Sequence, residues 1–243
     1  MDKGNDIKAV FFDIDDTLYG FTNLNARAKR GVYQYLVEKY PVSWEKFEEI
    51  EQDTILETVQ RLGSNHPTSH NRLIRFQNML TKLGIPVYPY AKEMYDRYWN
   101  LIIENVLPEA GLKELLQKLK SYGIYLGIGT NMTIDIQIRK LEKLGIVEYF
   151  DYVVTSEEVG IGKPSVYFFE FCAKKAGCKM SECLFVGDSL KNDIQGARDA
   201  GMHAVCYNRY SMVKEKDAEE TVSSYLECVA LEKVQIGNMQ IYQ

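Results

Sequence analysis

Residues 9–18 read AVFFDIDDTL, and this stretch decides the fold. Residues 7–12 are apolar apart from Lys8, β-branched and aromatic, and they predict a short buried strand that ends where the carboxylates begin. Because alternate side chains of an extended backbone share a face, Asp13 and Asp15 are expected to point the same way, with Ile14 in the core. Two carboxylates at one strand end repel each other unless a cation or a proton is shared between them. The stretch outlines a metal site or an acid/base pair, and a plain acidic turn is the alternative.

After this strand the apolar residues recur with helical spacing for roughly 85 residues, and no strand signal interrupts them. Proline and glycine residues separate the helical segments. The pattern predicts a bundle of about four helices, inserted directly after the first strand. The expected helices are 24–40, 43–62, 68–83 and 89–104.

From Pro108 onward the chain alternates between helical and strand patterns, which is typical of a parallel α/β sheet. Right-handed crossovers then place all the strands in one sheet with helices on both faces. The fold class is therefore α/β, with a doubly wound, mostly parallel Rossmann-like sheet. The expected strands are 124–128, 152–155, 184–186 and 204–207, and the expected helices are 109–121, 133–144, 166–176, 193–200 and a last one within 221–232.

The composition is that of an ordinary soluble globular protein: 243 residues, 46% hydrophobic and 26% charged. A net charge of -5 gives no basic surface for a nucleic-acid polymer, although small anionic substrates remain possible. Five cysteines without a CxxC pair favour buried free thiols in a reducing cytoplasm. The polar first residues lack a signal-peptide pattern, and no apolar run is long enough for a membrane span. We expect a cytoplasmic protein that acts without a membrane.

Polar residues follow each predicted strand, at the edge where ligands bind to open parallel sheets. Besides Asp13 and Asp15, these are Thr130 and Asn131, then Lys163 in a GIGKP turn, then Asp188, with Asp193 a few residues on. Taken singly, each is more often a helix cap, a turn or a solvated charge. Their joint appearance at one sheet edge is what favours an active site.

These residue types suit phosphoryl chemistry around a hard cation. Several carboxylates without a histidine fit Mg²⁺, and Asp188 would complete its shell. Asp13 could act as a nucleophile, since a cation and Lys163 would stabilise both its ionised form and the incoming charge. Asp15 could donate a proton to the leaving oxygen and later take one from water. Asp193 would orient Lys163 or a metal-bound water.

Four motifs of the chain resemble, in the same order, those of the haloacid dehalogenase-like (HAD) superfamily, and the match covers nearly the whole chain. The motifs are Asp13-x-Asp15-x-Thr17, Thr130-Asn131, Lys163-Pro164 and Gly187-Asp188-Ser189-x-x-Asn192-Asp193. The helical insertion looks like the type I cap of that superfamily. This implies a catalytic core of residues 1–18 and 108–243 and a cap domain of residues 19–107. The stretches Asp15-Asp16-Thr17-Leu18-Tyr19 and Ser156-Glu157-Glu158-Val159-Gly160 resemble the nucleotidase and sugar-phosphate phosphatase branches of that superfamily.

The resemblance implies an aspartyl-phosphate mechanism. Asp13 would attack phosphorus, Asp15 would serve as acid and base, and Thr130, Asn131 and Lys163 would hold the phosphoryl group. The Mg²⁺ would be bound by Asp13, the Asp15 backbone carbonyl and Asp188.

We therefore favour a Mg²⁺-dependent phosphomonoester hydrolase acting on a small phosphorylated metabolite. A phosphomutase on the same scaffold is a near rival. A metal-independent haloacid dehalogenase is less favoured because halide leaves without protonation, so Asp15 would have no task. A non-catalytic binding protein would be expected to lack one of the site residues. Selectivity should reside on the cap, where Tyr19, Phe21, Arg72 and Arg75 are candidates for touching the leaving group; the substrate and the oligomeric state stay open.

Overall fold

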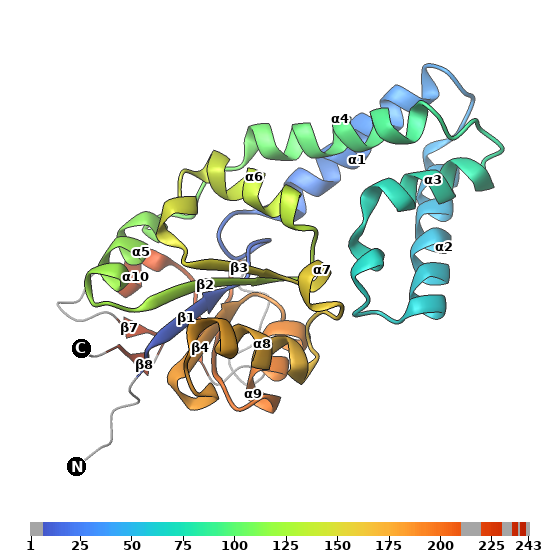
Figure 1. Cartoon of the computed structure of the whole chain (residues 1–243). Helices are drawn as coiled ribbons and strands as arrows, with labels where there is room; N and C mark the ends of the chain where they lie inside the picture. The colour runs from blue at the N-terminus through green and yellow to red at the C-terminus, as the bar shows by residue number, and fades with distance from the viewer. Residues whose placement is uncertain (1–6, 210–219, 230–234, 238, 242–243) are drawn as a thin grey trace, which may run out of the picture.

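A six-stranded parallel sheet forms the centre of the molecule in a computed structural model that describes residues 7–209, 220–229, 235–237 and 239–241 (Figure 1). Its strands are β1 (Ala9–Phe12), β2 (Tyr125–Thr130), β3 (Tyr152–Thr155), β4 (Cys183–Gly187), β5 (His203–Tyr207) and β6 (Thr221–Val222). They lie in the order β3-β2-β1-β4-β5-β6. The strand order reverses direction at β1, so the sheet is doubly wound as the sequence predicts.

Helices cover both faces of this sheet. On one face lie α5 (Leu112–Ser121), α6 (Ile134–Leu144) and α10 (Tyr225–Val229), and on the other lie α8 (Val166–Ala176) and α9 (Gly196–Asp199) (Figure 1). Alternate side chains of β1 serve the two layers: Val10 and Phe12 belong to one apolar cluster, and Ala9 and Phe11 to the other. Burial on both faces explains why this strand is a continuous apolar run.

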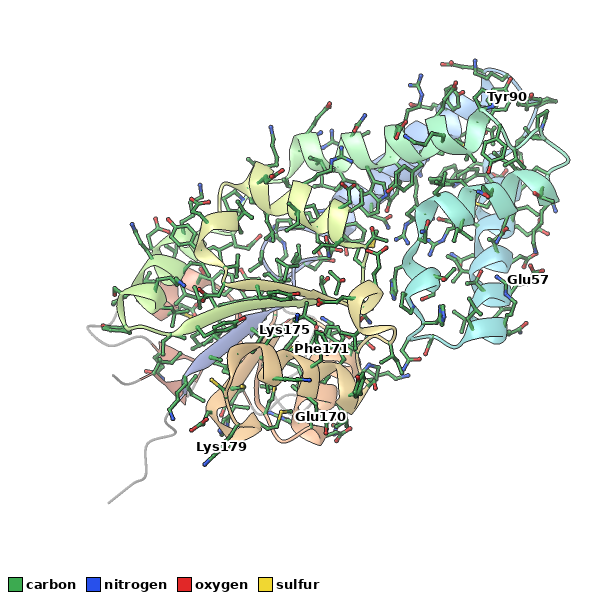
Figure 2. The ribbon with its side chains drawn as sticks, in the orientation of Figure 1. Glu57, Tyr90, Glu170, Phe171, Lys175 and Lys179 are labelled. Atoms are coloured by element: carbon green, nitrogen blue, oxygen red, sulfur yellow. The ribbon has the colours of Figure 1, made fainter. Side chains whose placement is uncertain are left out.

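The inserted segment consists of α1 (Phe21–Val37), α2 (Trp44–Leu62), α3 (Arg72–Lys82) and α4 (Tyr90–Asn105). Helices α1 and α4 run side by side away from the sheet, and Tyr90 marks the far end of α4 (Figures 1 and 2). Near the sheet α4 packs on α6. A 3-10 turn, η1 (Pro67–His70), contacts the short helix α7 (Ser156–Val159). None of the described helices combines the length and apolar character needed to cross a bilayer.

The predicted helix 68–83 is wrong as a single piece. The chain breaks at Asn71, whose side chain accepts hydrogen bonds from the backbone N–H groups of Leu73 and Ile74 and so caps α3. The residues before it form η1 instead. An asparagine that bonds the backbone two and three residues on is a strong helix start, which explains the break.

Other boundaries also differ from the prediction. The expected helix 193–200 begins earlier, as a π-helical turn, η4 (Leu190–Gln195), that leads into α9. Helix α5 begins three residues later than expected. The expected tail helix is reduced to α10, preceded by β6, and its residues 230–232 lie outside the described part. The short strands β7 (Gln235–Ile236) and β8 (Met239–Gln240) form an antiparallel pair that the pattern did not indicate.

Candidate active site

The sequence-predicted residues meet at the carboxyl ends of β1, β2 and β4. Phe12, the last residue of β1, pairs with Ile128 of β2 and Val186 of β4, which brings the segments after these strands together. Lys163 reaches in from the loop before α8. Its Nζ lies 2.8 Å from Asp13 Oδ1 and 2.5 Å from Asp193 Oδ1. The lysine is 3% exposed and Asp193 is 1% exposed, so this is a buried charge network.

Three carboxylates gather beside this lysine. Asp13, Asp188 and Asp193 each offer an oxygen, and these oxygens all lie within 4.8 Å of one another. Burial, reinforced by Asp193 and Asp13, raises the pKa of Asp188 to about 8. Burial also raises the pKa of Asp13 to about 6, although Lys163 opposes the shift. Crowded oxygen ligands that resist ionisation without a cation fit a hard divalent ion.

Two glycines allow the side chains of this network to pack closely. A Cβ on Gly187 would lie 2.4 Å from Asp193 Oδ2, and one on Gly162 would lie 2.4 Å from Asn131 Oδ1. Asn131 donates from Nδ2 to the Lys163 carbonyl and accepts from the Lys163 N–H, at 2.9 and 2.8 Å. Its amide is thus occupied in holding the lysine loop, which argues against the predicted contact of this side chain with phosphate.

The Thr130 hydroxyl lies buried at the end of β2. It accepts a hydrogen bond of 2.7 Å from Gln137 Nε2 of α6, which leaves its own proton to be donated elsewhere. Thr130 and Asn131 do not cap α6, whose N-cap residue is Thr133. A hydroxyl held in this way is suited to donate to an anionic oxygen.

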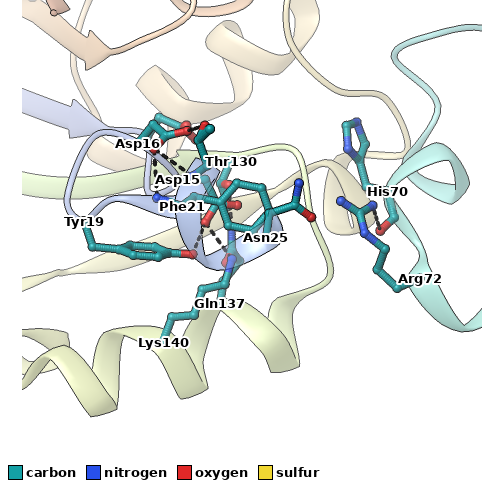
Figure 3. A network of polar contacts seen from close by, with 12 residues as sticks. Asp15, Asp16, Tyr19, Phe21, Asn25, His70, Arg72, Thr130, Gln137 and Lys140 are labelled. Carbon is teal, nitrogen blue, oxygen red and sulfur yellow. Dashed lines mark hydrogen bonds and ion pairs between the residues drawn. The ribbon is translucent and has the colours of Figure 1, made fainter. Parts of the chain in front are cut away.

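The Asp15 carboxylate has partners of its own (Figure 3). Asp15 Oδ1 accepts from the Tyr19 hydroxyl at 2.5 Å and from Lys140 Nζ at 2.7 Å. Lys140 is fully buried, and its ammonium lies 5.0–5.6 Å from the ring centres of Tyr19, Phe21 and Trp99. Burial lowers the pKa of this lysine, and Asp15 opposes the shift. The proposed acid/base residue is therefore held in place from two sides.

Asp16 has a different task. It adopts a left-handed backbone with φ 57°, and its carboxylate accepts from the N–H groups of Phe21 and Thr22 and from the Thr22 hydroxyl. The acidic-turn alternative thus describes Asp16, which caps α1, but not the two carboxylates before it.

Several site residues escaped the sequence reasoning. Gln137 and Lys140 lie three residues apart on the buried face of α6, and two polar residues on an apolar helix face were a usable signal. His70 of η1 has an Nε2 without a hydrogen-bond partner. Burial, with Arg72 and Arg75, lowers the pKa of His70 to about 4, so its ring is neutral at pH 7. Of the proposed cap contacts, Tyr19 touches Asp15 directly.

The cysteines carry no visible role in this site. All five are free, as the sequence predicts, and four of them are buried.

The fold and this centre define a doubly wound α/β enzyme with a carboxylate–lysine cluster at the strand ends. A haloacid dehalogenase-like hydrolase family model matches residues 7–201. The chain belongs to this family, as its motifs suggest.

Named relatives cover most of the chain. It is 34% identical to a ribulose-1,5-bisphosphate 5-phosphatase of Halopiger xanaduensis, over 88% of each protein. It is 33% identical to a glyceraldehyde 3-phosphate phosphatase of Methanothermobacter thermautotrophicus, over 88% of this chain and 91% of that protein. A crystal structure of a 2-haloacid dehalogenase from Pseudomonas syringae pv. Tomato DC3000 has a TM-score of 0.73 at 25% identity, covering 90% of this chain and 95% of that one.

Proposed function

We propose that this protein is a Mg²⁺-dependent phosphomonoester hydrolase that acts on a small phosphorylated metabolite through an aspartyl-phosphate. The observation that carries the proposal is the Lys163 ammonium bound to both Asp13 and Asp193, with Asp188 beside them. The proposed nucleophile Asp13, the ammonium group of Lys163 and the proposed metal ligands thus lie together at one sheet edge. The phosphatase names of the relatives support the same class.

Asp13 is the proposed nucleophile. One of its oxygens would attack phosphorus, and the bond from phosphorus to the ester oxygen would break. Lys163 would offset the charge of the transferred group, and the Thr130 hydroxyl would donate to one of its oxygens. A Mg²⁺ bound by Asp13, Asp188 and the Asp15 backbone carbonyl would add positive charge there. Asn131 and Asp193 are assigned to holding Lys163 in place.

Asp15 is the proposed acid and base. Protonated Asp15 would give its proton to the departing alkoxide, so that a neutral alcohol leaves. The resulting carboxylate would then take a proton from the water that attacks the Asp13 phosphoryl group. Phosphate leaves, the Asp13 carboxylate is regenerated and Asp15 is protonated again. Tyr19 and Lys140 would keep this side chain oriented between the two half-reactions.

The division of labour between core and insertion is also proposed. Residues 1–18 and 108–243 would carry the chemistry, and residues 19–107 would form a cap that sorts substrates. The cap reaches the catalytic loop, since the Gly162 N–H donates to the Asn65 carbonyl at 2.7 Å. The relatives' names differ in whether the substrate carries one phosphate or two, so the family does not decide the substrate.

The test is hydrolysis of p-nitrophenyl phosphate with Mg²⁺, with EDTA added in a second arm. We expect phosphate release that stops with EDTA and that is lost in Asp13→Asn but kept in Asp53→Asn, an exposed carboxylate on α2. Acid quenching during turnover should trap phosphate on Asp13. Unchanged phosphate release in EDTA would refute the Mg²⁺ requirement, and phosphate passed to an acceptor rather than released would favour the mutase.

A further inference from the structure

Two basic side chains of the insertion lie near the proposed catalytic centre. In Figure 3 the Arg72 guanidinium points from the start of α3 toward Asn25, and His70 lies beside it. Within the insertion, Arg72 Nε donates to the Tyr98 hydroxyl at 3.4 Å, and this hydroxyl donates to Asn25 Oδ1 at 2.6 Å. Asp15 also acts electrostatically on both His70 and Arg72.

The neighbouring basic residues have a carboxylate partner. Glu51, which is 5% exposed, lies 2.5 Å from Lys29 and 3.8 Å from Arg75. Arg75 also donates to the Ser69 carbonyl at 2.9 Å. These contacts explain Lys29 and Arg75 as parts of the cap's own structure.

Arg72 differs from them. Within the described part of the chain no carboxylate lies within 4.0 Å of its guanidinium, which instead donates to the neutral oxygens of His70 and Tyr98. The guanidinium carbon lies 5.6 Å from the centre of the Tyr98 ring, so the group is fixed in orientation. Burial disfavours the charge of Arg72, but Tyr98, Glu51 and Asp15 raise its pKa, so the guanidinium stays charged, and its planar fork matches a carboxylate or a phosphate.

We propose that Arg72, with His70 beside it, forms a second anion-binding site, so that the substrate is a phosphomonoester with a further carboxylate or phosphate on its leaving portion. This rests on the proposed function. The transferred phosphoryl group would meet Lys163 and Thr130, while the second anion would meet the cap. His70 Nε2, which has no partner, would supply a neutral hydrogen bond to the same group.

Matched substrate pairs test the proposal. Glyceraldehyde 3-phosphate and 3-phosphoglycerate share a three-carbon skeleton and differ in an aldehyde or a carboxylate. Ribulose 5-phosphate and ribulose 1,5-bisphosphate differ in a second phosphate. We expect kcat/KM to favour the doubly anionic member of at least one pair by about ten- to hundredfold, the range of a charge-assisted hydrogen-bonded pair. The pair that shows the preference tells whether the second anion of the substrate is a carboxylate or a phosphate.

Arg72→Met should remove this preference, while Arg72→Lys should retain part of it. Arg27→Met, an exposed arginine of α1, is the matched control and should keep the preference. Equal rates within both wild-type pairs would overturn the second-anion site without any variant. An equal loss on both members in Arg72→Met would also overturn it. Absence of phosphatase activity toward every substrate would instead refute the proposed function itself.

Discussion

Binding of Mg²⁺ should expel a proton from the carboxylate cluster. The pKa of Asp188 is raised to about 8 and that of Asp13 to about 6, each chiefly by burial. At pH 7 the metal-free protein therefore holds Asp188 mostly protonated and Asp13 mostly ionised. A cation bound by both residues needs both ionised. We expect about one proton to be released per Mg²⁺ at pH 7.

The affinity for Mg²⁺ should follow the same equilibria. Between pH 6 and pH 8 it should rise about tenfold per pH unit, and it should level off above pH 8. Both pKa values lie above the ordinary 3.8, so the metal-free fold binds these protons more tightly than the unfolded chain. The carboxyl groups of Asp13 and Asp188 make their full contribution to the free energy of unfolding below about pH 4. This contribution is lost as the pH rises through 6 and 8. Saturating Mg²⁺ should offset this loss.

Titration calorimetry at pH 7 in two buffers of different ionisation enthalpy counts the protons directly. Asp188→Asn should weaken Mg²⁺ binding and abolish most of the release, while Asp53→Asn on the exposed face of α2 should change neither. Tight binding without proton release would mean that the carboxylates are already ionised, and the argument from burial would fail. No binding at any pH up to 9 would refute the cation site.

Three substitutions test the supports of the site. Lys140→Met should lower kcat by about ten- to hundredfold with little change in KM, because Asp15 loses one of its two partners; an unchanged kcat would deny Lys140 a positioning role. Gly187→Ala should cost about 1–3 kcal/mol in the free energy of unfolding, measured by urea titration, since its Cβ would meet Asp193 Oδ2 at 2.4 Å. Thr130→Val should reduce kcat/KM by at least about tenfold on any phosphomonoester, and wild-type kinetics would show that its hydroxyl touches no phosphoryl oxygen.

The gathering of these residues at one sheet edge was predictable because parallel strands end on the same side of a sheet. A polar residue at the end of an apolar strand, or directly after it, is placed there by topology alone, which accounts for Asp13, Thr130 and Asp188. Lys163 does not directly follow a strand, and it was predicted from its place in the GIGKP turn. What the pattern did not indicate is the partner of each group: that Asn131 holds the Lys163 backbone depends on loop packing, not on periodicity.

Residues that come from the insertion were harder to place. The four-helix pattern was readable, but the break at Asn71, and with it the direction of the segment before α3, follows from one local cap. The segment that carries His70 and Arg72 is placed near the sheet edge by the packing of η1 on α7, a contact between segments nearly ninety residues apart in sequence. No local signal specifies such a contact. Lys140, by contrast, could have been found from the sequence, because it is a charged residue on the apolar face of a predicted helix.

The charges of the site suit the proposed division of tasks between core and insertion. With every group ionised, the core centre has four carboxylates against two ammonium groups, a formal charge of -2 that one divalent cation would offset. These groups are Asp13, Asp15, Asp188, Asp193, Lys140 and Lys163. Without the cation, a dianionic phosphoryl group would be repelled from its own site, so metal removal should weaken substrate binding as well as turnover. Arg72 stands outside this balance. It lies in the insertion and has no carboxylate within ion-pair distance among the described residues, which suits its proposed role in recognising an anion on the part of the substrate that leaves.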